Sequence, residues 1–290
     1  GIPHIINIGA APQITEQGYK FVSRIFIPAP DIVTQGLSLM GDLFRATNVA
    51  PRTAVFMHVN DLFGQSMAGG IRALLPKLNY LPFKIIDTIP YDPAAKDLAV
   101  EISKAKAANP DFLMAVTRLN DAVILRREMV KQRFNTMGLI NPGGPGMYEE
   151  QFSKGLGRLA NFCVTNNPWY NPRTALTKRL QAAFAKAYPN DKFVYHGVNL
   201  AYTFEAIMVA ADAFKRAKST DPKALAEAIR QTDIAERATL GGRLKFNAKG
   251  QVEGPLMASL QIHDGIPKVI FPESAAETKP VFPWPEFKRA

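Results

Sequence analysis

Two segments of this 290-residue chain carry residue types suited to holding a small anion. The first is a loop of small residues, Gly9-Ala10-Ala11-Pro12, which follows a short apolar stretch. Glycine and alanine leave the backbone uncovered, so its N–H groups can approach a ligand closely. Such a loop suits a carboxylate. The alternative is a tight turn that packs under a helix.

The second candidate is Arg118, which follows the apolar, strand-like run DFLMAV at 111–116. Ligands of open α/β sheets bind beyond the carboxyl ends of the strands. A guanidinium at such an end can clasp a carboxylate through two parallel hydrogen bonds, with Thr117 as its neighbour. An ordinary solvated arginine is the alternative interpretation.

Strand-like and helix-like segments alternate along the chain, which predicts a parallel sheet with helices on both faces. Short apolar runs predict strands at 53–58, 83–88, 111–116 and 136–140, and a further strand within 159–167. Apolar spacing predicts helices at 31–47, from the end of the loop at 59–64 through about 78, and at 98–108, 121–133, 174–188, 198–215 and 222–231. Strands are also expected within 240–263, and the Pro-rich tail from Pro267 is expected to wrap a surface.

Composition narrows the class of protein. Hydrophobic content of 47% and charged content of 21% are typical of a globular protein, and no apolar run reaches the roughly 18 residues of a membrane span. The net charge of +10 is spread from Lys20 to Arg289 without a basic, aromatic-rich cluster, so nucleic-acid binding is not favoured. The single cysteine, Cys163, is expected in the core.

Patterns that would indicate a cofactor or catalysis are weak. The segment Gly155-x-Gly157-x-x-Ala160 has the spacing of a dinucleotide fingerprint but stands before a strand instead of after one. The run GGPG at 143–146 lacks the Lys-Ser/Thr of a phosphate loop, and the four histidines are far apart. We therefore expect no cofactor, no metal and no enzyme activity.

Several blocks, taken in order, resemble the type I solute-binding proteins of ABC importers, in the branch of the leucine/isoleucine/valine-binding protein. They are GIPHIINIGAAPQITEQGYKFVSR, TAVFMHVNDLFGQS, AAKDLAVEISKAKAANPDFLMAV, GPGMYEEQFSKGLGRLANFCVTN, YHGVNLAYTFEAIMVAADAFKRA and GGRLKFNAKGQVEGPLMASLQI. No block is specific alone, but their joint order covers nearly the whole chain. The resemblance implies a two-lobed, hinged α/β fold, the type I periplasmic-binding-protein fold, truncated at its N-terminus.

In that fold we expect residues 1–28 and 167–248 to form an incomplete lobe one. Residues 29–166 and 249–275 would form lobe two, and 276–290 a C-terminal tail. The chain would then cross between lobes near 25–32, 162–168 and 247–254, making a hinge that closes over a ligand in the inter-lobe cleft.

The resemblance also implies a function. We expect a monomeric periplasmic protein, with a signal peptide upstream, that passes a small carboxylate ligand to a membrane permease. An aromatic acid, a 2-oxo acid and an amino-acid-like ligand all remain open. The alternatives are a ligand-sensing domain of a receptor or regulator with the same fold, and an enzyme on a Rossmann-like scaffold.

The same resemblance implies which residues contact the ligand. The family's strand-end loop for the ligand carboxylate corresponds to Ile8, Gly9, Ala10 and Ala11, and the usual hydroxyl residue near Ala10 is absent. The segment VNDLFG resembles a family segment in which an aromatic residue covers the ligand.

Phe63 takes that aromatic position, as ligand wall or as core, and Asn60 is a further candidate contact. Either Asn60 or Asp61 would cap the following helix.

The segment NPGGPGMY lies where amino-acid binders of this family place an acidic residue for the ligand ammonium group. Here the chain offers Gly143 and Gly144, with Tyr148 as a hydroxyl that would reach the cleft or pack. Because a buried ammonium without a carboxylate is costly, this departure favours an acid without an amino group. Glu149 would restore the amino-acid interpretation only if its loop folds back.

Overall fold

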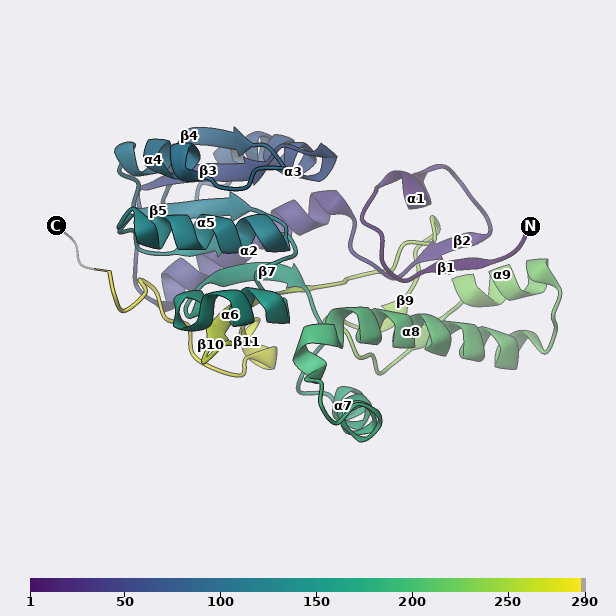
Figure 1. The fold of residues 1–290 in the computed structure, drawn as a ribbon. Coiled ribbons are helices and arrows are strands. Elements are labelled where there is room, and N and C mark those ends of the chain that lie inside the picture. Colours follow the sequence, from purple (N-terminus) through teal and green to yellow (C-terminus); the bar gives the residue numbers. More distant parts are fainter. Residues whose placement is uncertain (288–290) are drawn as a thin grey trace. The chain divides into compact units, whose positions relative to one another are not determined.

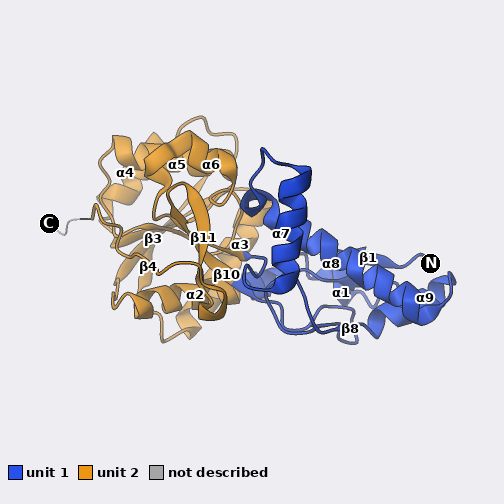
Figure 2. Ribbon diagram, turned by 90° about the horizontal axis from the view of Figure 1, so that it is seen from below, with its two compact units in different colours: residues 1–32, 168–257 blue, residues 33–167, 258–290 orange. Residues whose placement is uncertain are grey.

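The computed structural model describes residues 1–287 and divides them into two compact units. Unit 1 comprises Gly1–Ile32 and Pro168–Met257, and unit 2 comprises Val33–Asn167 with the described residues from Ala258 onward. Figure 2 shows unit 1 in blue and unit 2 in orange. By this division residues 249–257 belong to unit 1 and 276–287 to unit 2.

Unit 2 is built on a seven-stranded sheet with the order β11-β10-β7-β6-β5-β3-β4. The strands of this sheet are β3 Thr53–Val59, β4 Lys84–Tyr91, β5 Phe112–Val116, β6 Leu139–Asn141, β7 Val164–Pro168, β10 Met257–His263 and β11 Ile266–Phe271. The pairs β3–β4, β3–β5, β5–β6 and β6–β7 are all parallel, as expected. The predicted α/β class is confirmed.

Helices cover both faces of this sheet (Figure 1). On one face, Ile102, Leu125 and Phe152 pack with strand residues such as Val55 and Leu113 in one buried cluster. On the other face Phe44 of α2 meets Phe112 of β5, with ring centroids 5.6 Å apart. The helices are α2 (Ala29–Ala46), α3 (Leu62–Leu74), α4 (Ala99–Ala107), α5 (Leu119–Lys131) and α6 (Glu150–Leu156), with 3-10 turns η1 (Leu75–Lys77), η2 (Gly157–Ala160) and η3 (Glu273–Ala275).

The expectation of a surface-wrapping tail from Pro267 is wrong for its first residues. Strand β11 pairs antiparallel with β10 across a turn at Asp264 and Gly265, whose φ angles are 51° and 74°. Two residues with positive φ match the twist of the flanking strands and favour a tight hairpin. The signal was present in the Asp-Gly pair, but proline content obscured it.

Unit 1 contains a two-stranded parallel sheet, β1 (His4–Ile6) with β2 (Val22–Arg24), and a short antiparallel pair, β8 (Asp233–Ile234) with β9 (Leu244–Lys245). Its helices are α1 (Gln13–Glu16), α7 (Ala175–Ala187), α8 (Phe193–Ala217) and α9 (Pro222–Arg230). A buried ion pair joins Glu205 of α8 to Arg237 at 3.2 Å. Over residues 1–287, none of the helices combines the length and the apolar character that crossing a bilayer requires.

Candidate functional site

The carboxyl end of β3 leads directly into helix α3 through a tight turn. Asp61 caps the helix, because its carboxylate accepts a hydrogen bond from the Gly64 backbone N–H at 2.8 Å. A Cβ at Gly64 would stand only 1.7 Å from the carbonyl oxygen of Val59, so the turn requires glycine. The tight turn places Phe63 in the first turn of α3, directly beyond the sheet edge. Of the two predicted caps, Asp61 is the one observed.

The neighbouring strand β5 ends in the same way, with Arg118 at the N-cap position of α5. The backbone N–H of Arg118 donates to the Asp121 carboxylate at 2.8 Å, and the same carboxylate accepts a hydrogen bond from the Tyr91 hydroxyl. Burial and the nearby Asp121 carboxylate together raise the pKa of Tyr91, which keeps its hydroxyl a donor. The backbone at Arg118 is therefore held by a buried anchor.

The side chain of Arg118 reaches back to the β3–α3 turn. Its Nη2 and Nε donate to Asp61 Oδ2 at 2.9 and 3.3 Å, and its Cζ lies 4.5 Å from the Phe63 ring centroid. The Arg118 side chain is 48% exposed and that of Asp61 is 29% exposed. Two residues predicted independently, Phe63 and Arg118, thus form one surface. We call Asp61, Phe63 and Arg118 the guanidinium cluster.

The charge state of the guanidinium cluster follows from these contacts. Partial burial pushes the pKa of the Asp61 carboxyl upward, but hydrogen bonds from the Gly64 backbone and from Arg118 outweigh it. The net effect is a pKa below the ordinary aspartate value, so Asp61 stays ionised. Since both bonds from Arg118 go to a single oxygen of Asp61, the guanidinium retains donors for a second anion.

The third loop, after β6, approaches the same place. Asn141 Oδ1 accepts from the Gly143 backbone N–H at 3.0 Å, which closes a local turn. A Cβ at Gly144 would lie 3.3 Å from the Asn141 side chain and 3.4 Å from Phe63 Cζ. The predicted residue Gly144 therefore borders the guanidinium cluster, and Gly143 lies in the turn that precedes it. Asn141 was not singled out from sequence, although it begins the NPGG run.

A fully buried polar chain supports this loop. Asn141 Nδ2 lies 3.5 Å from Thr117 Oγ1, and Thr165 Oγ1 lies 3.4 Å from the Gly144 carbonyl oxygen. Asn167 donates to Thr165 Oγ1 at 2.7 Å. Thr117 has no exposed surface, and its hydroxyl faces the side-chain amide of Asn141. A direct contact of Thr117 with ligand stays a prediction.

The remaining candidates of unit 2 follow the same two strands, β3 and β6. Asn60 is exposed at the end of β3 and its Oδ1 accepts from Gln65 at 3.0 Å. Tyr148 is partly exposed, and burial, with a smaller contribution from the Glu149 charge, raises the pKa of its phenol to about 12. Burial likewise raises the pKa of Glu149, which stands at the start of α6.

In unit 1, the loop containing Ile8, Gly9, Ala10 and Ala11 is held by its carbonyl groups. Arg24 is buried and its Nη1 donates to the carbonyl oxygens of Gly9 at 3.1 Å and Ala11 at 2.6 Å. Its other donors reach Thr15 and Gln251. Sequence reasoning missed Arg24, because an arginine ending a three-residue strand carries no signal of burial. Ligand contact by the loop stays a prediction.

Comparison with known proteins identifies the family and the fold. The family model described as "Periplasmic binding protein" matches residues 8–265. No curated protein matches the chain by sequence.

Three solved structures share the fold at low sequence identity. A leucine-binding protein from Thermotoga maritima has a TM-score of 0.72 and 18% identity, over 92% of this chain and 71% of that one. A solute-binding protein from R. palustris, solved with benzoate, has a TM-score of 0.71 and 15% identity, over 96% and 72%. A substrate-binding protein from Desulfitobacterium hafniense, solved with leucine, has a TM-score of 0.68 and 18% identity, over 92% and 72%.

Proposed function

Since this chain belongs to the family of periplasmic binding proteins, we propose that it is the extracytoplasmic solute-binding component of an ABC importer. The proposed ligand is a small carboxylate that contacts the carboxyl edge of the unit 2 sheet. The observation that carries the proposal is the half-exposed side chain of Arg118, whose guanidinium lies against Phe63 just beyond the ends of adjacent strands. Such edges are where α/β proteins gather ligand-binding groups.

The guanidinium cluster favours an aromatic or 2-oxo acid. Arg118 supplies planar donors for a carboxylate, and the Phe63 ring offers an apolar face for the rest of the ligand. The one carboxylate within the cluster, Asp61, already accepts hydrogen bonds from Gly64 and Arg118. A ligand ammonium would therefore compete with two existing donors for Asp61. We infer that an acid without an amino group binds more tightly than an amino acid.

Isothermal titration calorimetry with benzoate, 4-methyl-2-oxopentanoate and leucine tests this proposal. We expect saturable binding of at least one of the two simple acids, and leucine at least tenfold weaker. Tighter binding of leucine would contradict the preference for an acid without an amino group. Failure of Arg118→Ala to weaken the bound acid, with Lys104→Ala as matched surface control, would remove the guanidinium cluster from the site.

The proposed role of ligand binding is transport of the ligand, and not a chemical reaction on it. Because relatives of this family are solute carriers, we propose that the loaded protein docks on a membrane permease in the periplasm and releases its ligand unchanged. Recovery of intact acid after prolonged incubation checks that no reaction takes place. Ligand uptake by vesicles that contain the permease, dependent on this protein, separates transport from the alternative role of ligand sensing.

A further inference from the structure

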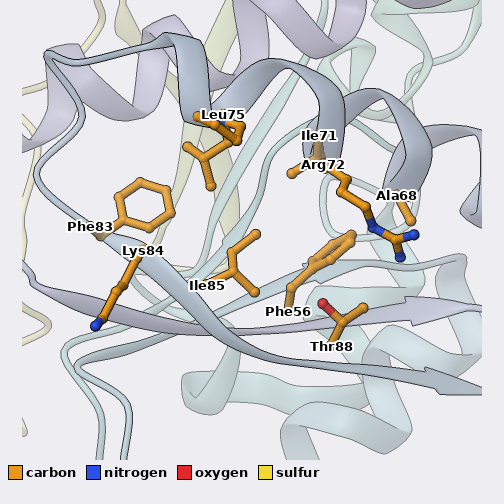
Figure 3. A pocket seen from close by; sticks show the side chains of 10 residues that line it. Phe56, Ala68, Ile71, Arg72, Leu75, Phe83, Lys84, Ile85 and Thr88 are labelled. Atoms are coloured by element: carbon orange, nitrogen blue, oxygen red, sulfur yellow. The ribbon is translucent and has the colours of Figure 1, made fainter.

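Unit 2 has a recess between helix α3 and the edge strand β4, and none of the residues that line it belongs to the guanidinium cluster. Its volume is about 380 Å³, within the range of about 300–1,000 Å³ that small-molecule sites occupy. Figure 3 shows apolar side chains of α3 and of the following turn η1, Ile71 and Leu75, facing Phe56, Phe83 and Ile85 from the strand side. We call this recess the edge pocket.

A β-bulge in β4 shapes the edge pocket. Ala54 pairs with Ile85 and Val55 pairs with Asp87, so one residue of β4 is left without a partner on β3. Such an insertion reverses the alternation of faces. As a result Ile85 and Thr88, three positions apart, both line the pocket, and Thr88 lies opposite Phe56. A regular strand would have turned one of them to the other face.

Two cations border this apolar recess. Arg72, in the last turn of α3, and Lys84, at the start of β4, both line it and both are exposed. Within residues 1–287 neither side chain forms an ion pair, and no acidic residue is among those that line the pocket. Unpaired cations beside an apolar floor are complementary to a ligand with a hydrocarbon body and an anionic head.

The geometry points to a second ligand site here, for an aliphatic monocarboxylate of medium chain length. Its chain lies on Phe56, Ile71 and Ile85, and its carboxylate pairs with the cations of the rim. The edge pocket is distinct from the guanidinium cluster, although α3 contributes to both. Phe63 lies in the first turn of this helix and Arg72 in its last, so about 14 Å of helix axis separates them.

Octanoate is the probe for the edge pocket, titrated by calorimetry into the whole chain. We expect saturable binding that weakens at least tenfold in the double variant Arg72→Gln/Lys84→Gln. The matched control is Lys96→Gln/Lys104→Gln, which removes the same charge from exposed positions outside the pocket. Equal weakening in both double variants would overturn the proposal, because it would show a nonspecific effect of net charge.

A second variant tests the apolar part of the site. Thr88→Phe adds a β-favouring ring to the pocket side of an edge strand, so it fills the recess without removing either cation. We expect it to reduce octanoate binding at least tenfold, with the melting temperature without ligand held close to that of the parent. Undiminished binding in Thr88→Phe would contradict the assignment.

A third variant separates this site from the guanidinium cluster. Phe63→Ala leaves octanoate affinity unchanged if the edge pocket is the site, and it weakens benzoate binding if the proposed function is correct. Loss of octanoate binding in Phe63→Ala, with none in the pocket variants, would place octanoate at the guanidinium cluster. Absence of saturable heat with octanoate at millimolar concentration would overturn the edge pocket alone.

Discussion

The guanidinium of Arg118 lies over the ring of Phe63, with Cζ 4.5 Å from the ring centroid, although the two residues follow different strands. A cation over an aromatic face is worth about 0.5–1 kcal/mol at an exposed site. The contact, together with the ion pair to Asp61, limits the rotamers of a long side chain. These contacts favour the observed orientation of Arg118 before any ligand arrives.

Arg118→Ala is expected to weaken binding of the proposed acid at least tenfold, equivalent to about 1.4 kcal/mol. Arg118→Lys keeps the charge but loses the planar donor pair, so an intermediate loss is expected. Calorimetry measures both. Equal affinity of the lysine variant and the parent would show that charge alone, without donor geometry, holds the ligand.

Phe63→Ala is expected to discriminate between ligands. Removal of the ring takes away an apolar wall and one contact of Arg118, so benzoate should lose more affinity than an acid with a small body such as pyruvate. Phe63→Leu restores apolar area without the aromatic face and serves as the control. If both acids weaken to the same extent, Phe63 acts through Arg118 and not as a ligand wall.

Asp61→Asn is expected to change the pH dependence of stability. The pKa of Asp61 is lowered in the folded state from an ordinary value of 3.8, so its stabilisation is present above that pH and is lost as the pH falls through the folded-state value. Asparagine caps helices about as well, which isolates the charge. We expect the parent to exceed the variant by about 0.5–1 kcal/mol at pH 6 and by less below pH 4. Urea unfolding across this range measures the difference.

Gly146→Ala and Gly69→Ala are expected to shift stability in opposite directions. Gly146 has φ of 105°, and a Cβ there would stand 2.5 Å from the Arg118 carbonyl oxygen. A loss of about 2 kcal/mol or more follows from the strain. Gly69 lies in α3 with nothing within 4 Å of an added Cβ, so alanine there should stabilise by up to about 1 kcal/mol. Thermal unfolding compares them.

Arg24→Met is expected to destabilise unit 1 by about 3 kcal/mol. It leaves the carbonyl groups of Gly9 and Ala11 without their donor while it keeps the apolar stem. Arg45→Met, at an exposed arginine, should stay within about 0.5 kcal/mol. Hydrogen exchange should also accelerate around residues 9–16 in Arg24→Met alone. A rigid loop in that variant would show that Arg24 does not hold it.

The repeating pattern of the unit 2 sheet was predictable because each parallel strand is a short, nearly continuous apolar run. Strand β5 is the clearest case, since all five of its residues are buried. Arg118 was found for the same reason, as it stands just beyond the carboxyl end of this run, whereas Phe63 was found through the resemblance of VNDLFG to a family segment. The hairpin turn at Asp264 was missed where proline content outweighed the turn signal.

Long-range contacts set the limit of sequence reasoning. Nothing local distinguishes Arg24, which is buried and donates to neutral acceptors on three segments, from an exposed arginine. The bulge that brings Ile85 and Thr88 to one face has no signal in the local sequence either, because it depends on how β4 pairs with β3. Asn141 supports the site through Thr117, a partner more than twenty positions away.

The sheet of unit 2 is assembled from two stretches of chain that meet where Phe162 donates to the Ile262 carbonyl at 2.8 Å and Ile262 donates back to Cys163 at 3.1 Å. The unit 1 segment Pro168–Met257 is therefore an insertion between β7 and β10, which are neighbours in the sheet. A protein engineer could excise residues 170–255 and bridge the gap with a few residues. Removal of residues 1–28 as well, which belong to unit 1 and precede α2, would leave a miniature that retains both the Arg118 surface and the recess beside β4.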